Sequence, residues 1–379
     1  MVGLTPKNTK DKHGNPKYRV SKEQWRLIQE ARNHGLVDAF ARQGVDPTVS
    51  PDLWLKGKEE SIRIKNPFFK EKSEKSYKEL EDIAIKSVSK FIDGKLKRID
   101  VSPDVIKSDN LFDVLVFTDA HIGMEPNKTG FSLYGGVWDE NEIQSRLEAM
   151  ISYTLNKKNS NKLVIFELGD FMDGWDGETV RKGHKLPQNM TNEEAFDVGL
   201  NFKLSLASHL CSVYEEVDFI NICDDNHAGS FGYVVNSAFK KVIESLYTNI
   251  EVINQRKFID HYIYGDKVFI ATHGKDGANL KFGFKPRLDP VQIEKIENYL
   301  FENDLVSKNL DVYFLKGDSH QDIFDNSTSQ KFRYWNFPAF SPSSNWVQTN
   351  FKKGISGFYN ITFAPKQYIL NPYYFDWKS

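Results

Sequence analysis

Five apolar runs in this sequence each lead into side chains that can bind a metal ion. The first run, residues 113–117, is followed by Asp119 and His121. On an extended backbone, residues i and i+2 point to the same side, so this carboxylate and this imidazole could converge on one point. Alone the pair is a weak signal, because strand-end Asp-x-His pairs also arise by chance.

Similar groups follow four later apolar runs. They are Gly169-Asp170-Phe171-Met172-Asp173, Asp225-Asn226-His227, His273-Gly274 and Gly317-Asp318-Ser319-His320. Functional sites of open α/β sheets assemble at the carboxyl ends of strands, so these groups are expected to meet. The alternation of apolar strands with helical patterns favours an α/β fold.

The ordered series Asp-x-His, Gly-Asp-x-x-Asp, Asn-His, His-Gly and Gly-x-x-His resembles the calcineurin-like metallophosphoesterase superfamily, over roughly residues 111–365. Its SbcCD-type exonuclease branch is the nearest in character. The resemblance implies an α/β fold of four layers, an α/β/β/α metallophosphoesterase sandwich. Residues 111–379 would form this catalytic domain, and residues 1–110 a basic, mainly helical N-terminal extension.

The resemblance also implies two divalent metal ions. Asp119, His121 and His320 would hold one, Asn226, His273 and Asp318 the other, and Asp170 would bridge them. Oxygen ligands mixed with imidazoles favour Mn²⁺, with Mg²⁺, Fe or Zn²⁺ as alternatives. Two such metals can activate a water molecule for attack on phosphorus.

His227 is the candidate general acid for the leaving oxygen. Asp173 could hold the tautomer of His227 and raise its pKa. Two blocks depart from the family pattern. Asp318 replaces a histidine and adds a carboxylate, while Asp225 replaces a glycine and Ala228 replaces an acid that does not bind metal.

The charge of the chain is uneven. The net charge is −2, but residues 1–100 hold 22 Lys and Arg against 15 Asp and Glu. This basic N-terminal region is compatible with binding an anionic partner and equally with a solvated surface.

Residues 1–18 are polar and expected to be disordered. Two short helices are expected, after Ser21 and over residues 36–42, as a helix-turn-helix or a packing arm, and a further helix is expected over residues 71–93. Lys56, Lys58, Arg63 and Lys65 could contact phosphates.

The first functional hypothesis is a metal-dependent DNA nuclease. The alternatives are a phosphomonoesterase or small phosphodiesterase acting on proteins or nucleotides, and a nucleic-acid-binding accessory subunit whose site is secondary. No Gly-x-x-x-x-Gly-Lys-Ser/Thr loop occurs, so an ATPase partner would be a separate chain. A homodimer is left open, and the substrate-binding residues are not identified.

The expected location is the cytoplasm. Cys211 and Cys223 are the two cysteines, too few for a disulfide framework. The first residues lack the apolar core of a secretory signal, and no apolar stretch has the length of a membrane span. No membrane partner is expected.

Overall fold

The computed structural model describes residues 5–10, 16–19, 111–126, 136–180, 183–223, 225–274, 287–306, 310–343, 354–365 and 367–375. The chain divides into two units, Met1–Ala84 and Ile85–Ser379. The domain boundary predicted at residue 110, the helices predicted before it and the four basic residues at 56–65 lie outside the described residues, so these predictions stay untested.

The described part of the first unit is a small hairpin. Strand β1 (Thr5–Lys10) pairs antiparallel with β2 (Pro16–Arg19). The prediction of disorder over residues 1–18 was wrong for these segments. Strand pairing uses backbone groups, so a polar composition does not by itself prevent it.

The second unit contains a six-stranded sheet with the order β13-β12-β3-β4-β5-β6. The strands are β3 (Phe112–Phe117), β4 (Lys162–Glu167), β5 (Glu216–Ile222), β6 (Ile250–Gln255), β12 (Gly357–Ala364) and β13 (Gln367–Tyr374). β3 to β6 are parallel, and β12 and β13 add antiparallel neighbours at one side. The three predicted strands that precede the first metal-binding groups are therefore adjacent.

A five-stranded sheet faces the first one, with the order β10-β11-β9-β8-β7. Its strands are β7 (Asp260–Tyr264), β8 (Lys267–Thr272), β9 (Asp311–Lys316), β10 (Ile323–Asp325) and β11 (Arg333–Asn336). β8, β9 and β11 are parallel, while β7 and β10 are antiparallel edges. β7 and β8 form a hairpin whose turn lies between Tyr264 and Lys267.

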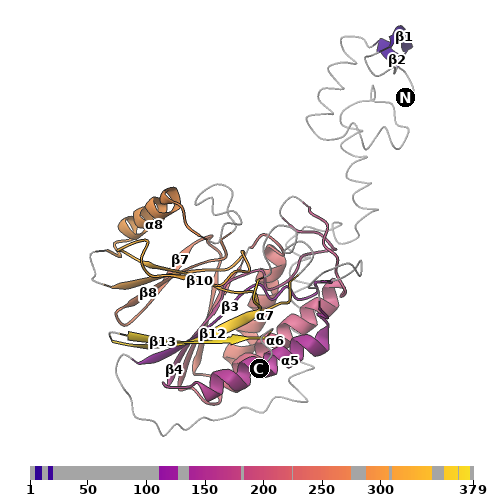
Figure 1. The fold of residues 1–379 in the computed structure, drawn as a ribbon. Coiled ribbons are helices and arrows are strands. Elements are labelled where there is room, and N and C mark those ends of the chain that lie inside the picture. Colours follow the sequence, from indigo (N-terminus) through magenta and orange to yellow (C-terminus); the bar gives the residue numbers. More distant parts are fainter. Residues whose placement is uncertain are drawn as a thin grey trace. The chain divides into compact units, whose positions relative to one another are not determined.

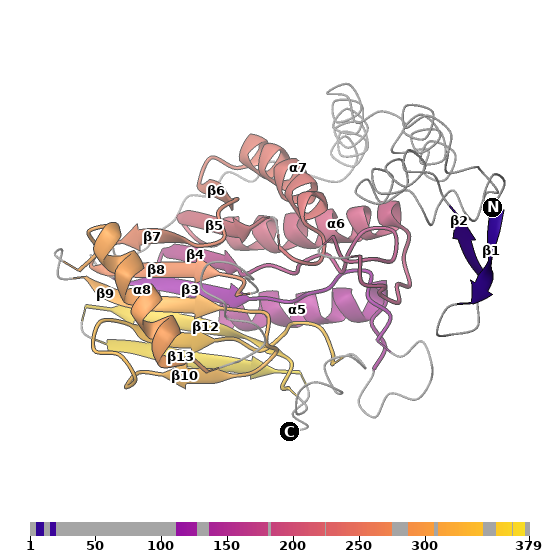
Figure 2. The same ribbon diagram turned by 90° about the horizontal axis from the view of Figure 1, so that it is seen from above.

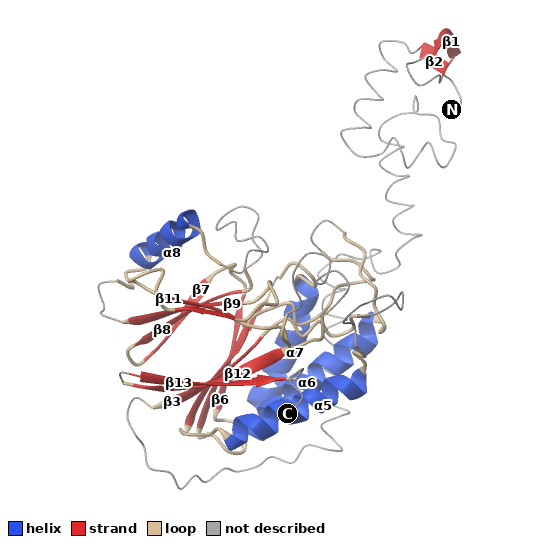
Figure 3. Ribbon diagram, viewed as in Figure 1, coloured by secondary structure: helices blue, strands red, loops and turns tan. Residues whose placement is uncertain are grey.

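Helices cover the outer face of each sheet (Figures 1 and 3). They are α5 (Glu140–Asn156), α6 (Asn192–Cys211) and α7 (Ser230–Leu246) on the six-stranded sheet, and α8 (Pro290–Glu302) on the other. Figure 2, seen from above, shows α8 lying across the strands. The predicted α/β/β/α sandwich is confirmed.

Alternating side chains fill the three interfaces between these layers. In β3, Leu115 and Phe117 join the core beneath the helices, whereas Val114 and Val116 join the core between the sheets. The core under α8 is built in the same way from alternate residues of β8 and β9. A strand buried on both faces reads as a continuous apolar run, which is why the sequence reveals these strands.

Side chains cap three of the four helices described in the second unit. Asp139 accepts a hydrogen bond from the Glu142 N–H at the start of α5, and Thr191 and Asp289 form capping boxes at α6 and α8. The exception is α7, which begins at Ser230 and has no side-chain hydrogen bond at its N-cap, Gly229.

No helix in the described ranges is long and apolar enough to cross a bilayer. Cys211 and Cys223 are both buried free thiols.

Candidate metal centre

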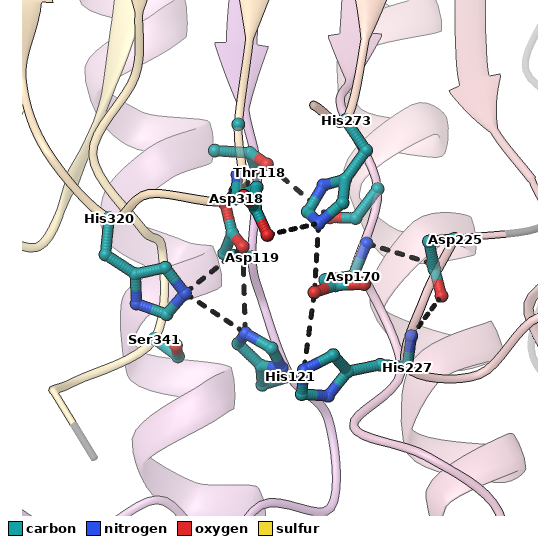
Figure 4. A network of polar contacts seen from close by, with 12 residues as sticks. Thr118, Asp119, His121, Asp170, Asp225, His227, His273, Asp318, His320 and Ser341 are labelled. Carbon is teal, nitrogen blue, oxygen red and sulfur yellow. Dashed lines mark hydrogen bonds and ion pairs between the residues drawn. The ribbon is translucent and has the colours of Figure 1, made fainter. Parts of the chain in front are cut away.

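The metal-binding groups of both sheets meet where β3, β4, β5, β8 and β9 end. Figure 4 shows the side chains turned toward one another at this corner, with His320 and Asp318 arriving from the loop after β9. Six of the seven predicted metal ligands therefore come together from two sheets rather than one: Asp119, His121, Asp170, His273, Asp318 and His320. The seventh, Asn226, is buried in the loop after β5. Their assignment as metal ligands stays a prediction.

The first group of side chains consists of Asp119, His121 and His320. One ligand atom of each lies within 4.8 Å of the others. Nε2 of His320 is 3.2 Å from Oδ1 of Asp119, and Nε2 of His121 is 3.7 Å from the same oxygen. This is the trio that the resemblance assigns to one metal.

The second group surrounds Asp170 and His273, which form a further three-residue cluster with Asp119. Nε2 of His273 is 3.0 Å from Oδ2 of Asp170 and 3.8 Å from Oδ1 of Asp318. The other ring nitrogen of His273, Nδ1, is 2.9 Å from the Leu168 carbonyl, which fixes the ring with Nε2 toward the carboxylates. Asp119 is the residue that the two clusters share, and the assignment of Asp170 as the bridging ligand stays a prediction.

Unusual backbone geometry places many of these side chains. Seven described non-glycine residues have positive φ, and five of them are predicted ligands. These five are Asp119 (53°), His121 (45°), Asp170 (48°), Asp318 (65°) and His320 (50°). Such angles are uncommon outside glycine and gather at functional sites. The prediction that Asp119 and His121 converge by lying on an extended strand was therefore wrong, since both lie in left-handed turns beyond the end of β3.

Two glycines allow the loops to approach closely. Gly169 has φ +93°, and a Cβ there would lie 3.0 Å from the His273 ring. A Cβ on Gly317 would overlap the Thr118 hydroxyl, which itself donates to Oδ2 of Asp119 at 2.7 Å. The glycines of these motifs therefore serve close packing of one loop against the next.

His227 lies at the accessible side of the centre. Its side chain is 18% exposed, whereas that of Asp119 is 0% and that of His121 is 4% exposed. Nδ1 of His227 is 2.8 Å from the Asp173 carbonyl, and Nε2 is 3.5 Å from Oδ2 of Asp170. The ring is oriented so that Nε2 points into the centre, where a bound substrate could meet it.

The carboxylate of Asp173 contacts two histidines. Its Oδ1 is 3.2 Å from Nδ1 of His121 and 3.5 Å from Nδ1 of His227. The predicted contact with His227 is present, but the backbone carbonyl of Asp173 is the closer partner of that ring. The sequence pattern did not indicate the additional contact with His121.

Asp225 holds the loop that carries Asn226 and His227. Oδ2 of Asp225 accepts a hydrogen bond from the Asp170 N–H at 2.9 Å, and Oδ1 accepts from the N–H groups of His227, Ala228 and Gly229. Figure 4 shows Asp225 between Asp170 and His227. Sequence analysis noted this residue only as a replaced glycine.

Opposite charges shift the pKa values of the acids and bases in the centre. Burial alone would lower the pKa of His121, but Asp119 and Asp173 raise it well above its usual value. Burial would also lower the pKa of His227, but the charge of Asp170 outweighs burial and raises it. For Asp170, burial would raise the pKa, yet the charges of the neighbouring histidines lower it.

Two buried oxygens provide a test of whether a cation fits. Oδ1 of Asp170 and Oδ1 of Asn226 are buried and have no hydrogen-bond partner. Leaving such an atom unsatisfied costs about 1–3 kcal/mol, and more for a charged group. A divalent cation beside each oxygen would satisfy it, so the chemistry of these groups fits the metals that the resemblance implies.

A buried lysine stabilises the loop after β4, which carries Asp170. Nζ of Lys203 in α6 is 2.9 Å from Oε2 of Glu167 and 2.7 Å from Oδ1 of Asn221. Oε1 of Glu167 accepts from the Gly169 N–H at 2.6 Å, one residue before Asp170. Sequence analysis missed this buried network of Lys203, Glu167 and Asn221. A lysine between Phe202 and Leu204 and a glutamate within an apolar strand could have indicated a buried ion pair.

Comparison with known proteins gives fold neighbours only. No protein-family model and no curated protein matches the chain. Among solved structures, wild-type Vps29 of Entamoeba histolytica complexed with Zn²⁺ matches with 12% identity and a TM-score of 0.29, over 70% of this chain and 99% of that one. A predicted phosphoesterase of Streptococcus pneumoniae matches with 10% identity and a TM-score of 0.28, over 69% and 98%. We draw no functional conclusion from similarities this low.

Proposed function

We propose that this protein is a dinuclear-metal phosphoesterase and, more specifically, a DNA nuclease that hydrolyses phosphodiesters. One observation carries the proposal: Asp119, His121 and His320 form one group, and Asp119 also belongs to a second group with Asp170 and His273, at one corner of the sandwich. A pair of bound cations is the simplest explanation for so many buried carboxylates and imidazoles at one corner.

The predicted ligands would be divided between the two metals. Asp119, His121 and His320 would hold one metal, Asn226, His273 and Asp318 the other, and Asp170 both. When bound, the metals supply Lewis-acid stabilisation of phosphoryl oxygens and a nucleophilic water. The carboxylates hold the imidazoles in place through the contacts described above.

His227 would supply the proton to the leaving oxygen. Its Nδ1 faces the Asp173 carbonyl, so the ring is held with Nε2 toward the substrate side. The charge of Asp170 raises the pKa of His227 above its ordinary value, which favours the proton-carrying form that a general acid needs. As the bond between phosphorus and the leaving oxygen breaks, that oxygen takes the Nε2 proton, and the ring is left neutral.

The choice of DNA rests on charge. Residues 1–100 carry a surplus of basic side chains, and Lys and Arg that neutralise phosphates are the main source of affinity for nucleic acid. A polymeric anion can contact several of these basic side chains at once, whereas a small phosphate ester can contact only a few. The partners we propose are therefore DNA and, as the resemblance leaves open, a separate ATPase chain.

The test offers the purified full-length chain, with Mn²⁺, labelled single-stranded and double-stranded DNA, p-nitrophenyl phosphate and bis-p-nitrophenyl phosphate. We expect DNA cleavage that His227→Ala reduces about 10²–10⁴-fold. His184→Ala, which changes a histidine in the exposed loop before α6, is the control and should retain activity. Hydrolysis of the monoester alone would indicate a phosphomonoesterase, and DNA binding without any hydrolysis an accessory subunit.

A further inference from the structure

The loop after β5 holds two predicted site residues, Asn226 and His227, but its geometry depends on their neighbour Asp225. The four hydrogen bonds that Asp225 accepts fall on two different segments. One oxygen contacts the backbone of the bridging residue Asp170, and the other contacts three consecutive N–H groups. A single carboxylate therefore connects the loop after β4 with the loop after β5.

The three N–H groups lie just before α7, on His227, Ala228 and the N-cap residue Gly229, which has φ 51°. None of them belongs to the first turn of the helix, which begins at Ser230. Asp225 therefore fixes the path of the chain from His227 to the helix rather than capping the helix itself.

Two residues near this loop, Asp225 and Ala228, depart from the family pattern, and the two departures are complementary. The resembled family has glycine at the position of Asp225 and an acid at the position of Ala228. Here the acid lies three residues earlier, and Ala228 is fully buried at 0% exposure. A glycine at position 225 could make none of the four hydrogen bonds.

We infer that Asp225 is a positioning residue of the metal centre, which fixes Asp170 relative to Asn226 and His227 by bonding the backbone of both loops. This inference rests on the proposed function, because it concerns the metals of that site. Groups that orient metal ligands typically contribute 10-fold to 100-fold to metal affinity. Asp225 would do so through main-chain atoms rather than through a ligand side chain.

The experiment measures the binding of Mn²⁺ to the full-length metal-free chain by titration calorimetry, together with the melting temperature. The central variant is Asp225→Asn, which keeps the shape but replaces one oxygen acceptor by an N–H donor. One of the two loops must then lose its partner. We expect the affinity for Mn²⁺ to fall about 10-fold or more. Asp225→Gly, which removes both acceptors, should lower it further.

A matched control exists at the opposite end of the same sheet. Asp113, in β3, is also buried and accepts two loop N–H groups, those of Asn159 and Ser160, at 2.8 Å and 3.0 Å. Asp113→Asn should lower the melting temperature and leave the affinity for Mn²⁺ unchanged. It therefore separates a loss of fold stability from a loss of ligand placement.

The outcomes are distinguishable. Weaker Mn²⁺ binding in Asp225→Asn but not in Asp113→Asn supports the inference. If Asp225→Asn melts earlier yet binds Mn²⁺ like the unchanged chain, Asp225 only stabilises the loop before α7 and the inference is overturned. If the unchanged chain itself binds no Mn²⁺, Zn²⁺ or Mg²⁺, the proposed function is refuted, and the inference with it. Should Asp225→Gly not fold, Asp225→Asn still decides.

Discussion

The Nε2 atoms of His121 and His320 lie 3.3 Å apart, although the two residues follow strands of different sheets. The ring centroids are 5.3 Å apart, and both nitrogens face Oδ1 of Asp119. Two nitrogens and one carboxylate oxygen directed at a common point match three ligands of one cation. The relationship also means that this cation would tie the two sheets together.

The first prediction concerns this pair. His320→Ala removes a ligand of one predicted metal and leaves the other set intact, so the metal bound per chain should fall from two ions to one. Elemental analysis after dialysis against Mn²⁺ measures the stoichiometry. His209→Ala, in α6 and away from the centre, should still bind two. Equal stoichiometry in both variants would show that His320 is not a ligand.

The second prediction is a pH dependence of metal binding. Burial would lower the pKa of His273, but the charge of Asp170 outweighs it and raises the pKa to about 10. Metals bind the neutral imidazole, so protons compete with them. The affinity for Mn²⁺ should therefore rise as the pH increases from 6.5 toward 10.

The metal-free protein should respond in the opposite direction. Because the pKa of His273 is higher in the folded than in the unfolded chain, its protonated form stabilises the fold fully below pH 6.5, and this contribution is lost as the pH rises through about 10. Melting curves in EDTA at several pH values measure the effect. His273→Gln should flatten part of the slope, and an unchanged slope would contradict the assignment.

The third prediction concerns metal choice. Asp318 lies where the resembled family has histidine, and an extra carboxylate favours Mn²⁺ or Mg²⁺ over Zn²⁺. Asp318→His should shift the ratio of affinities toward Zn²⁺ in competition titrations. Asp266→His makes the same exchange in the half-exposed turn between β7 and β8 and should leave the ratio unchanged. A ratio that is the same for both variants would remove Asp318 from the ligand set.

The fourth prediction tests the buried ion pair between Lys203 and Glu167, which lies next to the loop that carries Asp170. Lys203 is 0% exposed and paired with Glu167, so Lys203→Met leaves a buried carboxylate without its cation. Removing one partner of a buried pair typically costs about 3–5 kcal/mol in the free energy of unfolding. Urea denaturation measures the loss. The double variant Lys203→Met with Glu167→Gln should recover part of it, and no recovery would mean that the pair is not coupled.

The fifth prediction concerns DNA. Changing Lys56, Lys58, Arg63 and Lys65 to glutamine in the full chain should weaken DNA binding and reduce the slope of affinity against salt concentration, by about 0.9 for each phosphate that is no longer neutralised. Four lysines of the second unit, Lys157, Lys158, Lys241 and Lys295, changed in the same way, serve as the charge-matched control. Equal effects of the two variants would discard a DNA-binding role for the first set.

The sequence predicted the strands that are buried on both faces, because their apolar runs are continuous. In the second unit it missed β6, β10 and β13, each of which lies at an edge of a sheet. An edge strand pairs with a neighbour on one side only, so it tolerates a proline such as Pro372 and shows a weaker apolar pattern.

The identity of the groups in the centre was predictable, but their geometry was not. Residue types at strand ends indicated which side chains would meet. They did not indicate that Asp119, His121 and Asp170 would be in left-handed turns, because that conformation depends on packing between loops distant in sequence. The same holds for Lys203, whose partners lie 36 and 18 residues away.

The left-handed turns have a consequence for what these loops can become. Aspartate, asparagine and histidine enter that backbone region several-fold more readily than other side chains, apart from glycine. They are also the residues that coordinate hard cations. A library randomised at positions 119, 121, 170, 318 and 320 and selected only for folding would therefore already be enriched in chelating side chains, before any selection for catalysis.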